Sequence, residues 1–257
     1  MLRQAKVLKN YKLAARNGEI GKSKDIYFDD QSWIVRYLIV DTGGWLSGRQ
    51  VLISPYALDK PDDNNKVIPV SLTKEQIENS PSIEADKPVS RQDEWNYYSY
   101  YDWPGYWVGP YAWGPYSVPR RAAIGWSEDM RRATGNDPHL RSMKEVTGYN
   151  IQALDDSVGH VEDFIIDDDT RAIRYLIVDT RNWWPGKKVL VSPQWIDRVS
   201  WADSTVFVGL TREAIKEAPE YDENTAITRD YEAKLYRHYN REAYWTLEPA
   251  RATKAAG

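Results

Sequence analysis

The sequence predicts a mainly β protein that contains two copies of one small β-barrel, each followed by a short helix, and a further helix near the C-terminus. The first observation is an internal repeat, because RYLIVDT occurs at residues 36–42 and again at residues 174–180, an offset of 138. The second is that short apolar runs alternate with turn residues, which is the pattern of strands. The third is that both copies end in a segment with a helix cap and a proline stop.

The repeat extends without a gap on both sides of RYLIVDT. Residues 11–80 align with residues 149–218, and roughly a third of these positions are identical. Unrelated stretches do not match in this way by chance. We therefore expect two superposable barrels in which Trp45 and Trp183 are equivalent and the pairs Val51–Leu52 and Val189–Leu190 are buried.

Each copy contains four predicted strands. The first ends in an Asp-rich turn, where short polar side chains satisfy backbone groups. The second is an almost continuous apolar run, typical of a strand buried on both faces in a small closed sheet. The third ends at a proline, which lacks the backbone donor that a sheet requires. In order, these strands cover residues 20–28, 33–41, 51–55 and 66–71, and residues 158–166, 172–179, 189–193 and 205–209.

A short helix follows the last strand of each copy, with a threonine at the N-cap, a glutamate in the first turn and a proline after about two turns. These residues are Thr73, Glu75 and Pro81, and Thr211, Glu213 and Pro219. A longer helix is predicted over residues 229–244 after Thr228. Its apolar stripe should dock on a barrel and contains Tyr231, Leu235, Tyr236 and Tyr239.

Composition limits the function classes. The 257 residues carry a net charge of −4, with basic and acidic residues interspersed, which argues against a nucleic-acid protein with a broad basic face. There is no cysteine, which excludes disulfides and cysteine metal sites. The sequence shows neither a signal peptide nor an apolar run of about 18 residues that could cross a bilayer. We expect a cytoplasmic protein.

The repeated pattern resembles the PRC-barrel family. The resemblance rests on RYLIVDT followed by W, G, VL and SP, with IGKSKDIYFDD or VGHVEDFIIDDD before it. This family includes the cytoplasmic domain of the photosynthetic reaction centre H subunit and the C-terminal domain of a ribosome maturation factor, and tandem stand-alone bacterial members are most similar. The resemblance implies an adaptor with no family-wide catalytic residue. We expect a first barrel at residues 1–90, a linker at 91–146, a second barrel at 147–222 and a C-terminal helix with a disordered tail at 223–257.

Polar candidates for a catalytic or metal site are few. The Asp-rich turns lack the spacing and the glycine of a calcium loop and have no His or Lys partner within the motif, so turn chemistry is the favoured role. His139, His160 and His238 are widely separated and have no ligand pattern. The sequence contains no glycine-rich phosphate loop. We therefore predict no catalytic residue, no metal site and no cofactor.

The most unusual segment is an aromatic linker, residues 95–116, which shows neither a helical nor a strand period. Trp and Tyr are enriched at interfaces, so the segment is either an exposed binding surface or a cover for the barrels. No basic residue is interleaved with its rings, which disfavours stacking on single-stranded nucleic acid such as RNA. The candidate interaction residues are Trp95, Tyr97, Tyr98, Tyr100, Tyr101, Trp103, Tyr106, Trp107, Tyr111, Trp113 and Tyr116.

Basic residues follow the aromatic linker, around a short helix predicted at residues 127–133. Such pairs more often form a solvated or salt-bridged face than a nucleic-acid patch. They are Arg120, Arg121, Arg131, Arg132 and Arg141.

The favoured function is a non-catalytic adaptor or assembly protein that binds a protein partner or a second copy of itself through the barrel faces and the aromatic linker. One alternative is an enzyme or small-ligand carrier with a site between the barrels, which would require a deep polar pocket with convergent ionisable residues. A second is an RNA- or ribosome-associated factor, which would require a contiguous basic surface. DNA is not expected as a partner.

Overall fold

The computed structural model describes residues 1–81, 89–120, 139–180 and 186–247. The predicted mainly β architecture with two related sheets is confirmed. The chain forms two compact units. The first contains Met1–Thr147 and Asp163–Arg174, and the second contains Gly148–Glu162 and Tyr175–Gly257. The first unit thus includes a turn that belongs to the second sequence repeat. The predicted helix at residues 127–133, the predicted disordered tail from residue 248 onward and Trp183 lie outside the described residues.

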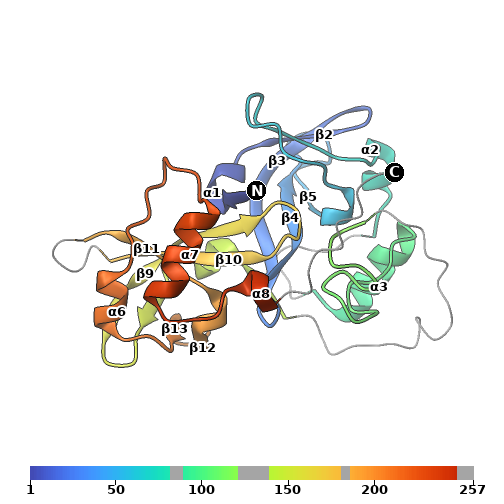
Figure 1. Cartoon of the computed structure of the whole chain (residues 1–257). Coiled ribbons are helices and arrows are strands. Elements are labelled where there is room, and N and C mark those ends of the chain that lie inside the picture. The colour runs from blue at the N-terminus through green and yellow to red at the C-terminus, as the bar shows by residue number, and fades with distance from the viewer. Residues whose placement is uncertain (82–88, 121–138, 181–185, 248–257) are drawn as a thin grey trace, which may run out of the picture. The chain divides into compact units, whose positions relative to one another are not determined.

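The first sheet has six strands in the order β5-β4-β3-β2-β6, and β7 pairs with β3. Strands β2 and β6 are parallel, whereas β2, β4 and β7 are each antiparallel to β3. Figure 1 shows β2 to β5 in blue tones, with the long strand β3 beside β4. The bounds are Lys12–Ala15 for β2, Gly18–Asp29 for β3, Ile34–Asp41 for β4, Gln50–Ile53 for β5, Val67–Pro69 for β6 and Leu140–Ser142 for β7.

The helices of the first unit are short. The helix predicted after Thr73 is confirmed, since the Thr73 side chain accepts from the backbone N–H of Gln76. Helix α3, which extends into the aromatic linker, was not predicted, because the segment has no helical period in its apolar residues. The helix begins with a capping box formed by Ser90 and Asp93. This capping box fixes the first turn, although the helix has no apolar stripe. The helices are α1 (Ala5–Leu8), the 3-10 turn η1 (Pro55–Ala57), α2 (Lys74–Glu78), α3 (Arg91–Tyr100) and α5 (Met143–Val146).

The second sheet has seven strands in the order β11-β10-β9-β8-β13-β12, and β1 pairs with β9. The strands are β1 (Leu2–Gln4), β8 (Asn150–Gln152), β9 (Ser157–Asp167), β10 (Ile173–Asp179), β11 (Lys188–Val191), β12 (Ile196–Ser200) and β13 (Thr205–Val208). The 3-10 turn η2 (Pro193–Trp195) and helices α6 (Arg212–Glu217) and α7 (Arg229–His238) follow the pattern of the first unit, and α8 (Tyr244–Leu247) is a further short helix. The caps predicted at Thr211 and Thr228 are confirmed.

The central strands are buried as the apolar runs predicted. Every residue of β10 is buried, and in β4 only Asp41 is exposed. The predicted burial of Val51, Leu52, Val189 and Leu190 is confirmed. Burial on both faces explains why these strands lack polar alternation.

A glycine at the same position of both repeats allows the long strands to approach closely. Gly21 and Gly159 have φ angles of +144° and +139°. A Cβ atom at either position would overlap the carbonyl oxygen of Asp41 or Asp179 on the adjacent strand. Only glycine accommodates both the backbone angle and the close approach.

The segments that precede the two repeats pair in a reciprocal way. Leu140–Ser142 of β7 pairs with the end of β3, and Leu2–Gln4 of β1 pairs with the end of β9, which belongs to the first unit. An arginine of each added strand forms an ion pair with the aspartate turn that follows the long strand. Arg141 Nε is 2.9 Å from Asp30 Oδ2, and Arg3 Nε is 3.1 Å from Asp168 Oδ1. The sequence repeat did not predict this pairing.

Candidate functional site

Most of the eleven Trp and Tyr residues predicted to mediate interactions pack inward against the first barrel. Five of these rings are buried, four are half-buried and two are exposed. The buried residues are Tyr97, Tyr98, Trp103, Tyr106 and Trp113. Trp95, Tyr101, Trp107 and Tyr116 are half-buried. Tyr100 is 42% exposed and Tyr111 is 51% exposed. The segment therefore covers its own barrel, and a role in binding a partner stays a prediction.

Helix α3 is the first-copy counterpart of α7. The same offset of 138 residues that relates the barrels also relates these helices and the residues after them. This extension of the repeat was not predicted, although it can be recognised from the sequence alone. The identical or similar pairs are Ser90/Thr228, Arg91/Arg229, Glu94/Glu232, Tyr98/Tyr236, Tyr101/Tyr239, Tyr106/Tyr244 and Trp107/Trp245.

A buried carboxylate links α3 to strand β4. The side chain of Glu94 has no exposed surface. Its Oε1 accepts hydrogen bonds from the hydroxyls of Tyr37 at 2.7 Å and Tyr106 at 3.0 Å, and its Oε2 accepts from Arg91 Nη1 at 2.6 Å. Burial raises the pKa of Glu94 to about 7, although Arg91 and the two hydroxyls oppose the shift. The cluster anchors the helix through Tyr37, which lies in the RYLIVDT motif.

The second unit contains the same cluster around Glu232. The hydroxyl of Tyr175, on β10, donates to Glu232 Oε1 at 2.7 Å, and the hydroxyl of Tyr244 donates to it at 3.0 Å. Arg229 Nη1 lies 3.1 Å from Glu232 Oε2. Arg229 is 56% exposed, whereas Arg91 is 14% exposed, so the first cluster is the more enclosed of the two.

The loop after α3 adds a layer of rings over Arg36, the buried arginine of RYLIVDT. The guanidinium lies 3.8 Å from the ring centroid of Tyr106 and 5.1 Å from that of Trp113. The Trp113 Nε1 group donates to the Thr170 carbonyl at 3.0 Å, and the Tyr56 hydroxyl donates to the Trp113 carbonyl at 3.1 Å. This network joins the loop to the barrel through polar as well as apolar contacts.

An open pocket of about 420 Å³ lies beside the C-terminal end of α3. Its lining comprises Arg16, Ser71, Leu72, Gln76, Tyr100, Tyr101, Asp102 and Trp103. In the second copy His238 stands at the position of Tyr100, and its Nε2 lies 2.7 Å from the Ala214 carbonyl. Arg241 stands at the position of Trp103 and donates to the Gly209 carbonyl at 2.6 Å. The two counterparts are therefore held by backbone hydrogen bonds of their own copy.

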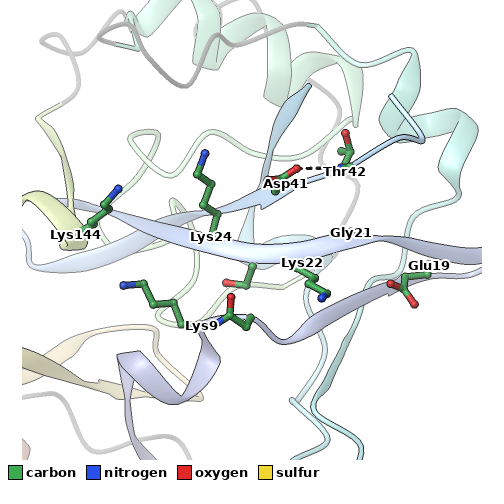
Figure 2. A pocket seen from close by; sticks show the side chains of 11 residues that line it. Lys9, Glu19, Gly21, Lys22, Lys24, Asp41, Thr42 and Lys144 are labelled. Atoms are coloured by element: carbon green, nitrogen blue, oxygen red, sulfur yellow. Dashed lines mark hydrogen bonds between the residues drawn. The ribbon is translucent and has the colours of Figure 1, made fainter. Parts of the chain in front are cut away.

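A second cavity, of about 700 Å³, is a groove along β3 lined by lysines (Figure 2). Its basic residues are Lys9, Lys22, Lys24 and Lys144, and the remaining lining is Asn10, Glu19, Gly21, Ser23, Asp41, Thr42 and Gly43. Sequence reasoning did not single out this groove, because Lys144 is distant in sequence from the other three lysines.

The Asp-rich turns have the structural role that was predicted. Asp29 Oδ1 accepts from the backbone N–H of Gln31 at 2.9 Å, and Asp167 Oδ1 accepts from that of Asp169 at 3.0 Å. The neighbouring residues Asp30 and Asp168 form the ion pairs with arginine described above. Hydrogen bonding thus fixes the turns in both copies.

The three histidines are not brought together in a cluster. Among the described residues, no group of three or more His, Asp or Glu side chains could hold a metal ion. His139 faces Asp30, with 3.8 Å between Nδ1 and Oδ1. Among the arginines that follow the aromatic linker, Arg120 has its guanidinium carbon 5.7 Å from the ring centroid of Tyr116. Arg121, Arg131 and Arg132 lie outside the described residues.

Comparison with known proteins points to one family. The family model described as the PRC-barrel domain matches residues 8–77 and 142–208. An uncharacterized protein of Deinococcus radiodurans is 34% identical to this chain over 77 residues. That match covers 30% of this chain and 27% of the Deinococcus protein's length. In the described parts of the chain, no helix is long and apolar enough to span a membrane.

Proposed function

The chain belongs to the PRC-barrel domain family, and from this premise we propose that it is a non-catalytic adaptor that binds a protein partner at the pocket beside α3. The resemblance to this family implies an adaptor role. The observation that carries the proposal is a difference between the copies: Tyr100 and Trp103 line an open pocket beside α3, whereas their counterparts His238 and Arg241 are hydrogen-bonded to backbone carbonyls beside α7.

The residues around the pocket are of the kind that dominate protein interfaces. Tyr100 and Tyr101 offer large rings in a T-shaped pair, with centroids 4.8 Å apart, and Tyr101 stacks on Trp103 at 4.5 Å. Arg16 is exposed, and its side chain has no partner among the described residues. Tyr, Trp and Arg are the residue types most often found at interface hot spots. We infer a partner segment that places an apolar side chain on the rings and an acidic side chain near Arg16.

The proposal is tested by co-purification of the full chain from its native host. We expect the wild type to recover a specific protein and the double variant Arg16→Ala, Tyr100→Ala to lose it. The matched control changes the equivalent residues of the second copy, Leu154→Ala and His238→Ala, and should retain the partner.

Self-association is measured with the same variants by analytical ultracentrifugation. A partner that is a second copy of this chain would appear as a dimer that the first double variant dissociates. Recovery of the same partner by both double variants would reject the pocket as the binding site.

A further inference from the structure

We propose that the lysine groove along β3 binds a short chain of phosphate groups. The groove lies within the first unit, and the proposal is independent of the protein-binding pocket beside α3. Figure 2 shows the groove with β3 crossing it and the labelled lysines around that strand.

The groove concentrates unpaired positive charge in a chain whose net charge is −4. Lys9, Lys22, Lys24 and Lys144 are all exposed, and none has an ion pair with another described residue. The two carboxylates of the lining are already engaged. Glu19 lies 3.0 Å from the ammonium of Lys12, outside the groove lining, and Asp41 accepts from the backbone N–H of Gly43 at 3.0 Å. An anion that entered the groove would therefore meet free ammonium groups.

The backbone holds the lysines in fixed positions. Lys22 and Lys24 are two residues apart on β3, and Lys24 lies where the β3–β4 register shifts between Ser23 and Asp25. Such a bulge redirects the side chain that it carries. Lys144 is held by its own backbone N–H, which donates to Asp25 Oδ1 at 3.2 Å. The donors thus come from a bulged strand and a tethered helix rather than from a free loop.

The arrangement favours an extended ligand over a single ion. In Figure 2 the side chains of Lys24 and Lys144 extend in the same direction, whereas those of Lys9 and Lys22 lie on the other side of the β3 ribbon in this view. Ammonium groups on both sides of the strand suit several linked phosphates better than one. A chain of phosphates along a groove of about 700 Å³ could reach both sets.

The chemistry of the lining separates this ligand from nucleic acid. The groove contains no aromatic ring on which a base could stack, and single-stranded nucleic acids depend on such stacking. It contains no arginine for bidentate recognition, but lysine is an effective point charge for phosphate. The lining therefore offers positive charge to phosphate groups and no ring on which a base could stack.

The second copy lacks this set of charges. At the positions of Lys9, Lys22 and Lys24 it has Thr147, His160 and Glu162, and only Lys144 has a lysine as its counterpart, Lys6. The Glu162 carboxylate is instead paired with Lys188, at 2.6 Å. The full set of four lysines therefore occurs in the first copy only. If these lysines served only to keep the fold soluble, both copies would be expected to have them.

The test is calorimetric titration of the full chain with sodium tripolyphosphate. We expect one saturable site whose affinity falls with added salt. The variant Lys24→Gln, Lys144→Gln should bind about tenfold more weakly or worse, because it removes two charge-assisted contacts. The control is Lys216→Gln, Lys234→Gln, which also removes two positive charges. Both lysines are exposed, lie on the second-copy helices α6 and α7, and have no ion-pair partner among the described residues. The control should bind as tightly as the wild type.

Three outcomes would overturn the proposal. The first is the absence of saturable binding up to millimolar tripolyphosphate. The second is equal weakening by the two double variants, which would indicate nonspecific attraction. The third is tighter binding of a short RNA duplex with the same variant dependence, which would assign the groove to nucleic acid. Thermal melts confirm that the variants fold, and Lys22→Gln provides a second test should Lys144→Gln disturb α5.

Discussion

Helices α3 and α7 dock on their barrels through the same polar contact but different apolar surroundings. Tyr37 and Tyr175 each donate to a buried glutamate at 2.7 Å. Around α3, the position equivalent to Leu235 holds Tyr97, whose hydroxyl donates to the Leu52 carbonyl at 3.0 Å. The comparison indicates that the glutamate contact fixes the place of the helix, while the packing around it can be exchanged.

The 3-10 turns after the third strand show the same exchange. Tyr56 of η1 packs against Trp103 with centroids 5.7 Å apart, whereas in η2 the ring stands one residue later, at Trp195, and packs on Tyr236 at 5.2 Å. Both copies therefore have an aromatic ring in this turn, although at positions of the repeat that differ by one residue.

The largest effect is expected from the ring layer after α3. Trp113→Ala should lower the free energy of unfolding of the first unit by about 3–5 kcal/mol, because it removes a fully buried ring and leaves a cavity. The measurement is urea unfolding followed by circular dichroism. Tyr111→Ala is the control, because that ring is 51% exposed and its loss should cost less than about 0.5 kcal/mol. A small effect of Trp113→Ala would mean that the layer is dispensable and that the two docked helices are equivalent.

The second prediction concerns pH and the Glu94 cluster. The pKa of Glu94 is raised from 4.5 to about 7, so the folded state holds its proton more tightly than the unfolded state. The stabilisation from this proton is complete below about pH 4.5 and is lost as the pH rises through about 7. Relative to Glu94→Gln, the wild type should therefore lose up to about 3 kcal/mol across this window.

The measurement is the free energy of unfolding at several pH values for the wild type and for Glu94→Gln. The difference between them cancels groups that titrate in both proteins. Glu232→Gln is the matched substitution in the second copy and controls for the loss of a buried carboxylate as such. If the difference in the free energy of unfolding between the wild type and Glu94→Gln stayed constant from pH 4 to pH 8, burial would not raise the pKa of Glu94.

The strands were predictable because their signals are local. The apolar run at residues 33–41 and the VLISP segment define strands and a stop without reference to the rest of the chain. The helix N-caps at Thr73 and Thr211 could likewise be predicted from a few neighbouring residues. Helix α3 was missed for a different reason, because its rings stand on every side and leave no apolar stripe. The signals that could have revealed it are the Ser90–Asp93 cap and the continued repeat at Glu94 and Glu232.

The remaining features depend on residues distant in sequence. Arg3 and Asp168 are 165 positions apart, and nothing near either residue indicates their ion pair. The lysine groove has the same origin, since pairing of β7 with β3 brings α5 and Lys144 to the groove. Sequence patterns show which residues are buried, whereas such pairings require the folded chain.

The smallest effect is expected at the helix caps after the last strands, where the copies differ by one hydrogen bond. Thr73 accepts from the backbone N–H of Gln76 at 3.2 Å, and Gln76 Oε1 accepts from that of Thr73 at 2.9 Å. Thr211 accepts from the backbone N–H of Ala214 at 3.2 Å, but alanine cannot return the bond. Thr73→Ala and Thr211→Ala should each cost about 1 kcal/mol. Ala214→Gln should stabilise the second copy by about 0.3–0.5 kcal/mol because it completes the capping box. A destabilised Ala214→Gln variant would show that packing around α6, where His238 contacts the Ala214 carbonyl, outweighs the cap.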